Sequence, residues 1–219
     1  MKKNLQKLPA IFLVVIGILC FLPAKSQTEF GLKGGILFSD INDGGPDSNL
    51  SFERQEGLAL GAFYRRNNLM GRIGFQSELL YQLKGAEVFI KHIDTDTYGY
   101  GNEPGNFFPL YYRTQEKLHY VSMPLLFTVP TTKFFELYAG PEFNYLLSKN
   151  TNRIESGQFN RFSVGAAVGA TVKLGEKTRL DFRYTHDLTS YDDMGDTQNP
   201  AKLKSQGFSV TIQQTLFRK

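Results

Sequence analysis

The chain has 219 residues, a formal net charge of +4, 14% aromatic residues, no tryptophan and one cysteine. Residues 1–26 contain four lysines and no acidic residue, so the rest of the chain is close to neutral and offers no basic face for nucleic acid. The length suits one domain.

The N-terminal segment, residues 1–26, has the pattern of a secretory signal peptide. Lysines at its start precede an apolar run from Ala10 to Leu22, and small residues stand at Ala24 and Ser26. The run has about 13 residues, fewer than the ~20 that a membrane-spanning helix needs, which disfavours an uncleaved anchor. We predict a signal peptide over 1–26 and one domain over 27–219. Cleavage removes the cysteine, which excludes disulfides and cysteine-ligated metals.

Apolar and polar residues then alternate with a period of two, which indicates strands because successive side chains of a strand point to opposite faces. The segments, in chain order, are Thr28–Ser39, Glu56–Arg66, Gly71–Gly85, Lys117–Val129, Phe134–Leu147, Arg161–Leu174, Thr178–Leu188 and Ser205–Phe217. They run 11 to 15 residues. Globular strands usually have ~5–6 residues, whereas a tilted membrane strand needs ~9–11. Helical periodicity is missing, so we predict an all-β chain.

The connections between these segments alternate between long and short. The short ones are Asn67–Met70, Pro130–Lys133 and Gly175–Lys177, and the long ones are residues 40–55, 85–116, 148–160 and 189–204. An outer-membrane barrel with both ends in the periplasm has this order, because its surface loops are long and its periplasmic turns short. A soluble lipocalin-type barrel, with its apolar faces inward around a small apolar ligand, can alternate too and remains open.

We predict an eight-stranded antiparallel up-and-down transmembrane β-barrel in the outer membrane. Closure removes every sheet edge, which matters because an unpaired backbone group in lipid costs several kcal/mol. Eight strands enclose a space that side chains fill, whereas an open diffusion porin needs about 16. We therefore expect a plugged lumen. The predicted luminal ion-pair network consists of Arg72, Glu78, Glu136, Glu142, Asp181 and Arg183.

Aromatic residues near the strand ends predict girdles at the two membrane interfaces. They are Tyr64, Tyr81, Tyr120, Phe134, Phe135 and Tyr191. Phe217 near the end of the last strand fits the terminal aromatic residue of such barrels, although the period of two places it on the polar face.

Several segments resemble the PorT-like family of small outer-membrane β-barrels of Bacteroidota. They are GLKGGILFS (Gly31–Ser39), LHYVSMPLLF (Leu118–Phe127), YAGPEFNYLL (Tyr138–Leu147), VGAAVGATVKL (Val164–Leu174) and RYTHDLTS (Arg183–Ser190). Ser163 departs from the family pattern, where an acidic residue often opens the sixth strand, and His186–Asp187 departs where a glycine is common. The resemblance implies a signal-bearing, eight-stranded barrel without enzyme activity, with some members linked to protein secretion.

Catalytic and metal-binding patterns are weak in this chain. Arg183, His186 and Ser190 faintly resemble the His–Ser pair of lipid A deacylases, but those enzymes carry the serine two residues after the histidine, where Leu188 stands. Positions four apart on a strand are roughly 13 Å apart, beyond hydrogen-bond reach. An outer-membrane lipid hydrolase is thus a second alternative, and we predict no enzyme. His119 is expected to be a luminal or rim hydrogen-bonding residue.

The three histidines lack metal-ligand spacing. The first acidic loop fails the EF-hand pattern and nothing specifies a site in the second, so we predict no metal and no cofactor. These loops are represented by Asp94, Asp96 and Gly99 and by Asp192, Asp193 and Asp196.

The loop YGYGNEPGNFFPLYY (Tyr98–Tyr112) is the predicted contact loop. Tyrosine-rich loops offer contact area at low entropic cost, which suits protein or glycan partners. The contact residues are Tyr98, Tyr100, Phe107, Phe108, Tyr111 and Tyr112. The alternative is that this loop folds over the barrel rim or touches the outer leaflet. Outer-membrane lipid is the other expected partner, and we predict a monomer.

Overall fold

The computed structural model describes residues 27–43, 50–92, 110–150, 161–189, 192–194 and 201–219. The predicted signal peptide, residues 1–26, lies outside them, so it stays a prediction. In the described part of the chain, no helix has the length and apolar content to cross a membrane.

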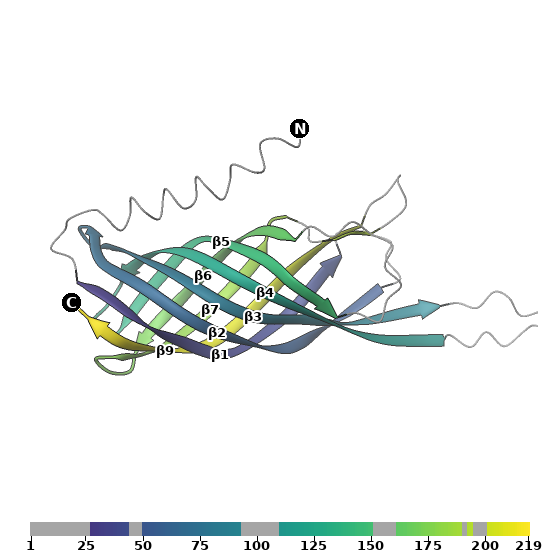
Figure 1. The fold of residues 1–219 in the computed structure, drawn as a ribbon, viewed down its shortest axis with the longest axis horizontal. Coiled ribbons are helices and arrows are strands. Elements are labelled where there is room, and N and C mark those ends of the chain that lie inside the picture. The colour runs from purple at the N-terminus through teal and green to yellow at the C-terminus, as the bar shows by residue number, and fades with distance from the viewer. Residues whose placement is uncertain (1–26, 44–49, 93–109, 151–160, 190–191, 195–200) are drawn as a thin grey trace, which may run out of the picture.

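In these described segments, nine strands form one antiparallel sheet in the order β1-β2-β3-β4-β5-β6-β7-β9-β8, and pairing of β1 with β9 closes it (Figure 1). Their bounds are β1 Thr28–Asp43, β2 Leu50–Met70, β3 Ile73–His92, β4 Leu110–Pro130, β5 Phe135–Asn150, β6 Phe162–Lys173, β7 Thr178–Asp187, β8 Asp192–Met194 and β9 Ala201–Arg218. The three-residue β8 only extends the hairpin with β9. The predicted eight-stranded antiparallel barrel is therefore confirmed, with β1–β7 and β9 as its wall.

The predicted loop over residues 85–116 is too long, because β3 and β4 continue into this range as a paired hairpin. The ladder runs unbroken from Gly85↔Lys117 to His92↔Leu110. Val88, Phe89 and Ile90 in one strand face residues 112–114 of the other, so β-branched and aromatic residues extend the pairing. Likewise β2 begins at Leu50, six residues before the predicted start at Glu56.

Both described ends of the chain and the three short turns lie at one end of the barrel (Figure 1). Thr28 and Lys219 are joined there by backbone hydrogen bonds of 3.0 Å in both directions. The β2–β3 turn contains two residues with positive φ, Asn68 at 57° and Gly71 at 64°, a conformation that asparagine and glycine adopt at least cost. Barrels of this kind place their short turns in the periplasm, so we call this the periplasmic end.

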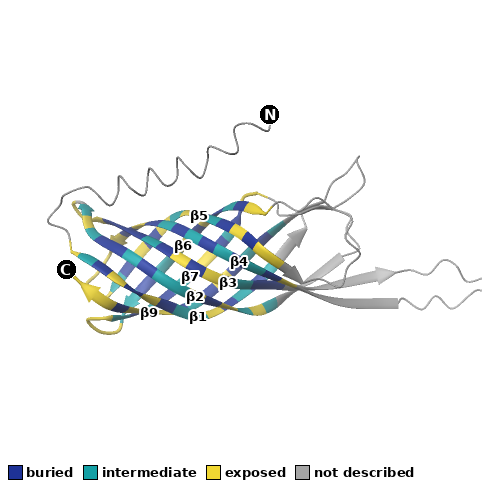
Figure 2. Ribbon diagram, in the orientation of Figure 1, coloured by how far each residue is buried: buried dark blue, intermediate teal, exposed yellow. Residues whose placement is uncertain are grey.

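More buried and more exposed residues alternate along most of the wall, with exceptions such as the adjacent buried pair Arg65 and Arg66 (Figure 2). The outward side chains are mostly apolar and include Leu32, Ile36, Leu60, Leu79, Phe127, Leu137, Val168 and Ile212, all at least 46% exposed. The inward ones are mostly polar or charged and include Lys33, Gln76, Glu78, Asn144, Thr171, Asp181 and Gln213, all at most 3% exposed. This is the reverse of what the soluble lipocalin-like alternative requires, and that alternative is wrong.

Two aromatic residues differ from the sequence interpretation. Tyr120 is 1% exposed and points into the barrel, because it shares the inner face of β4 with Ser122. Phe217 points outward and is 70% exposed. A β-bulge explains this reversal: Gly31 pairs with Thr215, but Phe30 pairs with Phe217, so the register skips Leu216. Tyr81 and Phe134 are exposed, as expected for girdle residues, whereas Tyr191 lies outside the described residues.

Candidate luminal ion-pair network

Glu78 on β3 is the centre of the charged interior. Its Oε1 lies 2.7 Å from Nη2 of Arg183 on β7 and 3.2 Å from Nζ of Lys33 on β1. Gln76 also donates a hydrogen bond to this oxygen. The three charged side chains are each at most 3% exposed. Two cations from two other strands thus converge on one carboxylate that bulk water does not reach.

Asp181 on β7 is the second anion of this centre. Lys33 donates to its Oδ1 at 2.7 Å, and Thr211 donates to the same oxygen at 3.2 Å. Gln213 and Thr171 donate to its Oδ2 at 3.3 and 3.4 Å. Because five strands contribute partners or charges to the Glu78–Asp181 centre, it crosslinks the barrel through its interior.

Tyr138 on β5 packs against the guanidinium of Arg183. Arg183 Nε donates to the tyrosine hydroxyl at 3.2 Å, and the guanidinium carbon Cζ lies 5.3 Å from the ring centroid, within cation–π range. The hydroxyl in turn donates to the carbonyl of Phe182 at 3.3 Å. The ring lies over Gly169 of β6, where any β-carbon would overlap it. The glycine therefore makes room for the ring that holds Arg183 in place.

Three further ion pairs, made by two carboxylates, lie at the periplasmic end of the described lumen. Arg65 of β2 lies 2.6 Å from Glu136 of β5, and its Nε donates to Gln76 at 2.6 Å, which connects this pair to the Glu78 centre. Glu29 of β1 binds Arg179 of β7 at 2.6 Å and Arg218 of β9 at 3.1 Å. The bulge at Leu216 places Arg218 on the same side as Glu29, so this β1 carboxylate binds the adjacent strand β9 and, beyond it, β7.

The charged side chains farther from the periplasmic end of the described lumen form longer ion pairs. Lys84 of β3 lies 3.7 Å from Glu142 of β5 and 5.3 Å from the Tyr120 ring centroid. Asn144 donates to Asp187 of β7 at 3.1 Å. Glu142 and Asp187 are 1% and 2% exposed. Charged and amide groups therefore occupy the lumen at this level as well.

Five of the six residues of the predicted network are inward-facing and buried: Glu78, Glu136, Glu142, Asp181 and Arg183. The placement of Arg72 in the lumen is wrong. It lies in the β2–β3 turn and is exposed, because β3 begins only at Ile73 and the alternation of faces holds only within a strand.

Sequence reasoning missed the partners of these residues. They are Glu29, Lys33, Arg65, Lys84, Arg179 and Asp187. Each lies on the face of its strand opposite to the outward apolar residues, so applying the alternation to every strand would have found them. The pairings themselves link strands up to 150 positions apart in the chain, which no local pattern contains.

His119 and His186, the histidines whose side chains are described, face outward. His119 shares a 2.6 Å hydrogen bond with the Tyr81 hydroxyl on the outer face of β3 and β4. The expected hydrogen bonding is therefore found, but a luminal placement is wrong. His186 and Asp187 are neighbours in β7 and therefore point to opposite faces. Ser190, the other half of the hydrolase alternative, lies outside the described residues. Within the described residues, no three histidine, cysteine or acidic side chains gather into a group able to hold a metal.

The predicted contact loop cannot be placed in the same way. Tyr98, Tyr100, Phe107 and Phe108 lie outside the described residues, as do Asp94, Asp96, Gly99 and Asp196. Tyr111 and Tyr112 belong to β4, but only their backbone is described, as is the case for Asp192 and Asp193 in β8.

Residues 23–193 match the family model described as outer membrane protein beta-barrel domain. The chain belongs to this family. Outward apolar faces, inward charges and closure by β1 and β9 are what such a barrel requires, and the outer membrane is its location. The comparison does not reach the narrower PorT-like assignment.

The fold is also similar to three small barrels of known structure. Ail from Yersinia pestis, solved with the heparin analogue sucrose octasulfate, has 13% identity and a TM-score of 0.45, with 88% of this chain and 100% of that chain covered. Neisserial surface protein A has 11% identity and a TM-score of 0.45, with 87% and 99% covered. OprG from Pseudomonas aeruginosa has 12% identity and a TM-score of 0.47, with 87% and 96% covered. Among curated proteins, none matches this chain.

Proposed function

We propose that this small outer-membrane barrel is a structural or surface-interaction protein with a plugged lumen, rather than a diffusion channel or an enzyme. The observation that carries the proposal is the interlocked Glu78 centre. Arg183 of β7 and Lys33 of β1 both reach the Glu78 carboxylate of β3, and each of these side chains is at most 3% exposed. Opening a pore would separate these charges in a confined space, which is costly.

Conductance measurements in planar lipid bilayers test the plugged lumen. The wild-type barrel is expected to give no steady current above that of the lipid alone. A variant in which a short Gly-Ser turn replaces residues 93–109 is expected to behave the same, because the proposed plug lies in the barrel wall's own side chains. A stable channel in the wild type would refute the plug, and a channel only in the shortened variant would show that the loop closes the lumen.

Surface contact is proposed for the loop that contains Tyr98–Tyr112. The β3–β4 hairpin that carries it extends the strands beyond the rest of the barrel wall (Figure 1), which supports a role outside the membrane. Photo-crosslinking on intact cells, from a probe at position 100, is expected to capture a protein or a glycan. Replacing Phe107 and Phe108 by serine should abolish the adduct. Adducts with outer-leaflet lipid alone would refute the proposal and support the rim-covering alternative.

The resemblance to PorT-like barrels extends the proposal to protein secretion at the cell surface of a member of the Bacteroidota. A strain lacking the chain is expected to lose a subset of secreted proteins from its medium, and expression of the chain should restore them. An unchanged set of secreted proteins would refute this extension and leave the barrel and its plug unaffected.

A further inference from the structure

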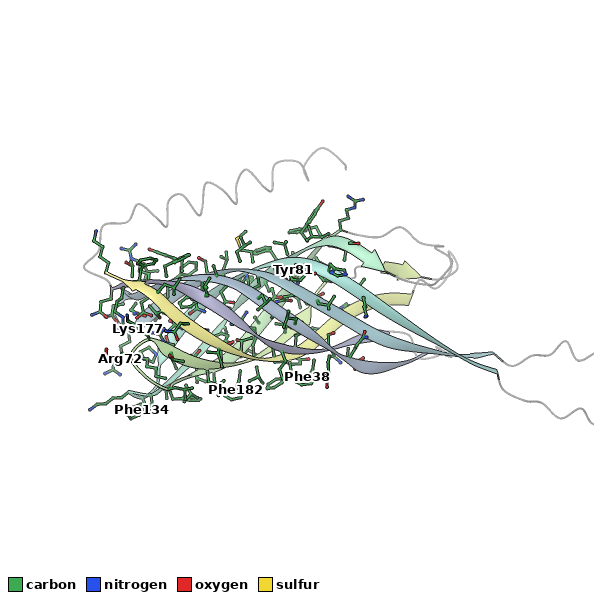
Figure 3. The ribbon with its side chains drawn as sticks, turned by 60° about the horizontal axis from the view of Figure 1, so that its bottom comes forward. Phe38, Arg72, Tyr81, Phe134, Lys177 and Phe182 are labelled. Atoms are coloured by element: carbon green, nitrogen blue, oxygen red, sulfur yellow. The ribbon has the colours of Figure 1, made fainter. Side chains whose placement is uncertain are left out.

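Each of the three periplasmic turns exposes one cation. Arg72 lies in the β2–β3 turn, Lys133 in the β4–β5 turn and Lys177 in the β6–β7 turn, and all three are exposed. Figure 3 shows Arg72 and Lys177 together at this end of the barrel. Within the described residues, none of the three side chains makes a hydrogen bond or ion pair. We call these three residues the basic rim.

The carboxylates at this end offset only part of the positive charge of the basic rim. Glu29 and Glu136 are 2% and 4% exposed, and both bind arginines inside the lumen. Glu176 is the one acidic residue in the three turns, residues 67–72, 131–134 and 174–177. The turns therefore present a net positive charge to the space outside the barrel.

A large apolar side chain accompanies every cation of the basic rim. Ile73 follows Arg72 and is 39% exposed, Phe134 follows Lys133 and is 68% exposed, and Leu174 in the turn of Lys177 is 62% exposed. Figure 3 shows Phe134 at the same end as Arg72 and Lys177. Phe134 fits an aromatic girdle at the membrane interface, and Ile73 and Leu174 stand at the end of the outward apolar band. The cations beside them therefore lie at about the height of the lipid headgroups.

We propose that the basic rim binds the phosphate groups of anionic phospholipids in the periplasmic leaflet. Three unpaired cations at headgroup height, each above an apolar anchor, match a ligand that has an anionic head and an acyl tail. Arg72 can hold a phosphate through two parallel N–H donors, whereas the two lysines act as point charges. This inference depends on the membrane-embedded barrel and is independent of the proposed plug and loop contacts.

Lipid retention tests the basic rim. The full chain is refolded into vesicles of equal parts phosphatidylglycerol and phosphatidylcholine, and the lipids still bound after transfer to detergent are counted by native mass spectrometry. The rim variant is Arg72→Gln/Lys133→Gln/Lys177→Gln. The control is Lys117→Gln/Arg161→Gln/Lys204→Gln, which removes the same charge from described residues at the opposite end. Heat-modifiable gel mobility verifies that all three proteins are folded.

The wild type is expected to retain phosphatidylglycerol in preference to phosphatidylcholine. In the rim variant, the ratio of retained phosphatidylglycerol to phosphatidylcholine should fall at least about fivefold, the factor expected from one cation near an anionic surface. In the control variant this ratio should fall less. Equal losses in both variants would show an effect of net charge alone and overturn the proposal. An unselective wild type, or a rim variant that retains the preference, would overturn it as well.

Discussion

Replacing Glu78 by glutamine removes the carboxylate on which two luminal cations converge. Arg183 lies 2.7 Å and Lys33 3.2 Å from it, and the side chain is 2% exposed. Removing one partner of a buried ion pair typically costs ~3–5 kcal/mol, because the other charge stays buried without its partner. Asp181 remains 2.7 Å from Lys33 but 3.9 Å from Arg183, so Arg183 is the residue left with the poorer partner. We expect a loss of unfolding free energy in this range.

A double-mutant cycle with Arg183→Met measures how much of this lost unfolding free energy comes from the Glu78–Arg183 ion pair. If the two side chains interact directly, the double variant is expected to be more stable than the sum of the single losses predicts, by ~0.5–3 kcal/mol. The chain has no tryptophan, so the folded fraction is best followed by heat-modifiable gel mobility across a urea series in lipid vesicles. Glu176→Gln, in an exposed turn, is the matched control and should leave the urea midpoint unchanged.

A Glu78→Gln midpoint equal to the wild type, with no coupling to Arg183, would refute the reasoning. It would mean that water solvates these charges in the lumen, and the plugged interior would lose its physical basis.

Three further changes probe other parts of the barrel in the same urea assay. Leu79→Arg puts a charge on an outward position that is 57% exposed, and should cost ~2–4 kcal/mol if it lies near the bilayer midplane; full tolerance would place this face in water. Gly169→Ala should lower the folded fraction because its β-carbon overlaps the Tyr138 ring, whereas Gly175→Ala, with nothing within 4 Å, should not; equal effects would contradict this packing. Glu29→Gln should lower the urea midpoint more than Arg218→Gln, whose side chain is 40% exposed, and the opposite order would rule out a bridging role for Glu29.

The strand pattern could be predicted because alternation is a local property of an extended chain. The period of two places Glu78 and Gln82 on one face without reference to any other strand. The same period, applied to β1 and to the rest of β3, gives Lys33 and Lys84. Prediction failed where the local rule stops. Arg72 lies beyond the end of its strand, and Phe217 follows a bulge that reverses the faces.

By itself, the sequence determined the all-β class, the approximate positions of eight strands and the chemistry of their two faces, because each of these depends on neighbouring residues only. Only the tertiary structure decided which face points inward and which charges meet. Glu29 and Arg179 are 150 positions apart and come together because β1 and β9 close the sheet, and closure is a property of all strands at once. The bulge beside that closure arises from the register between β1 and β9, so no single strand encodes it.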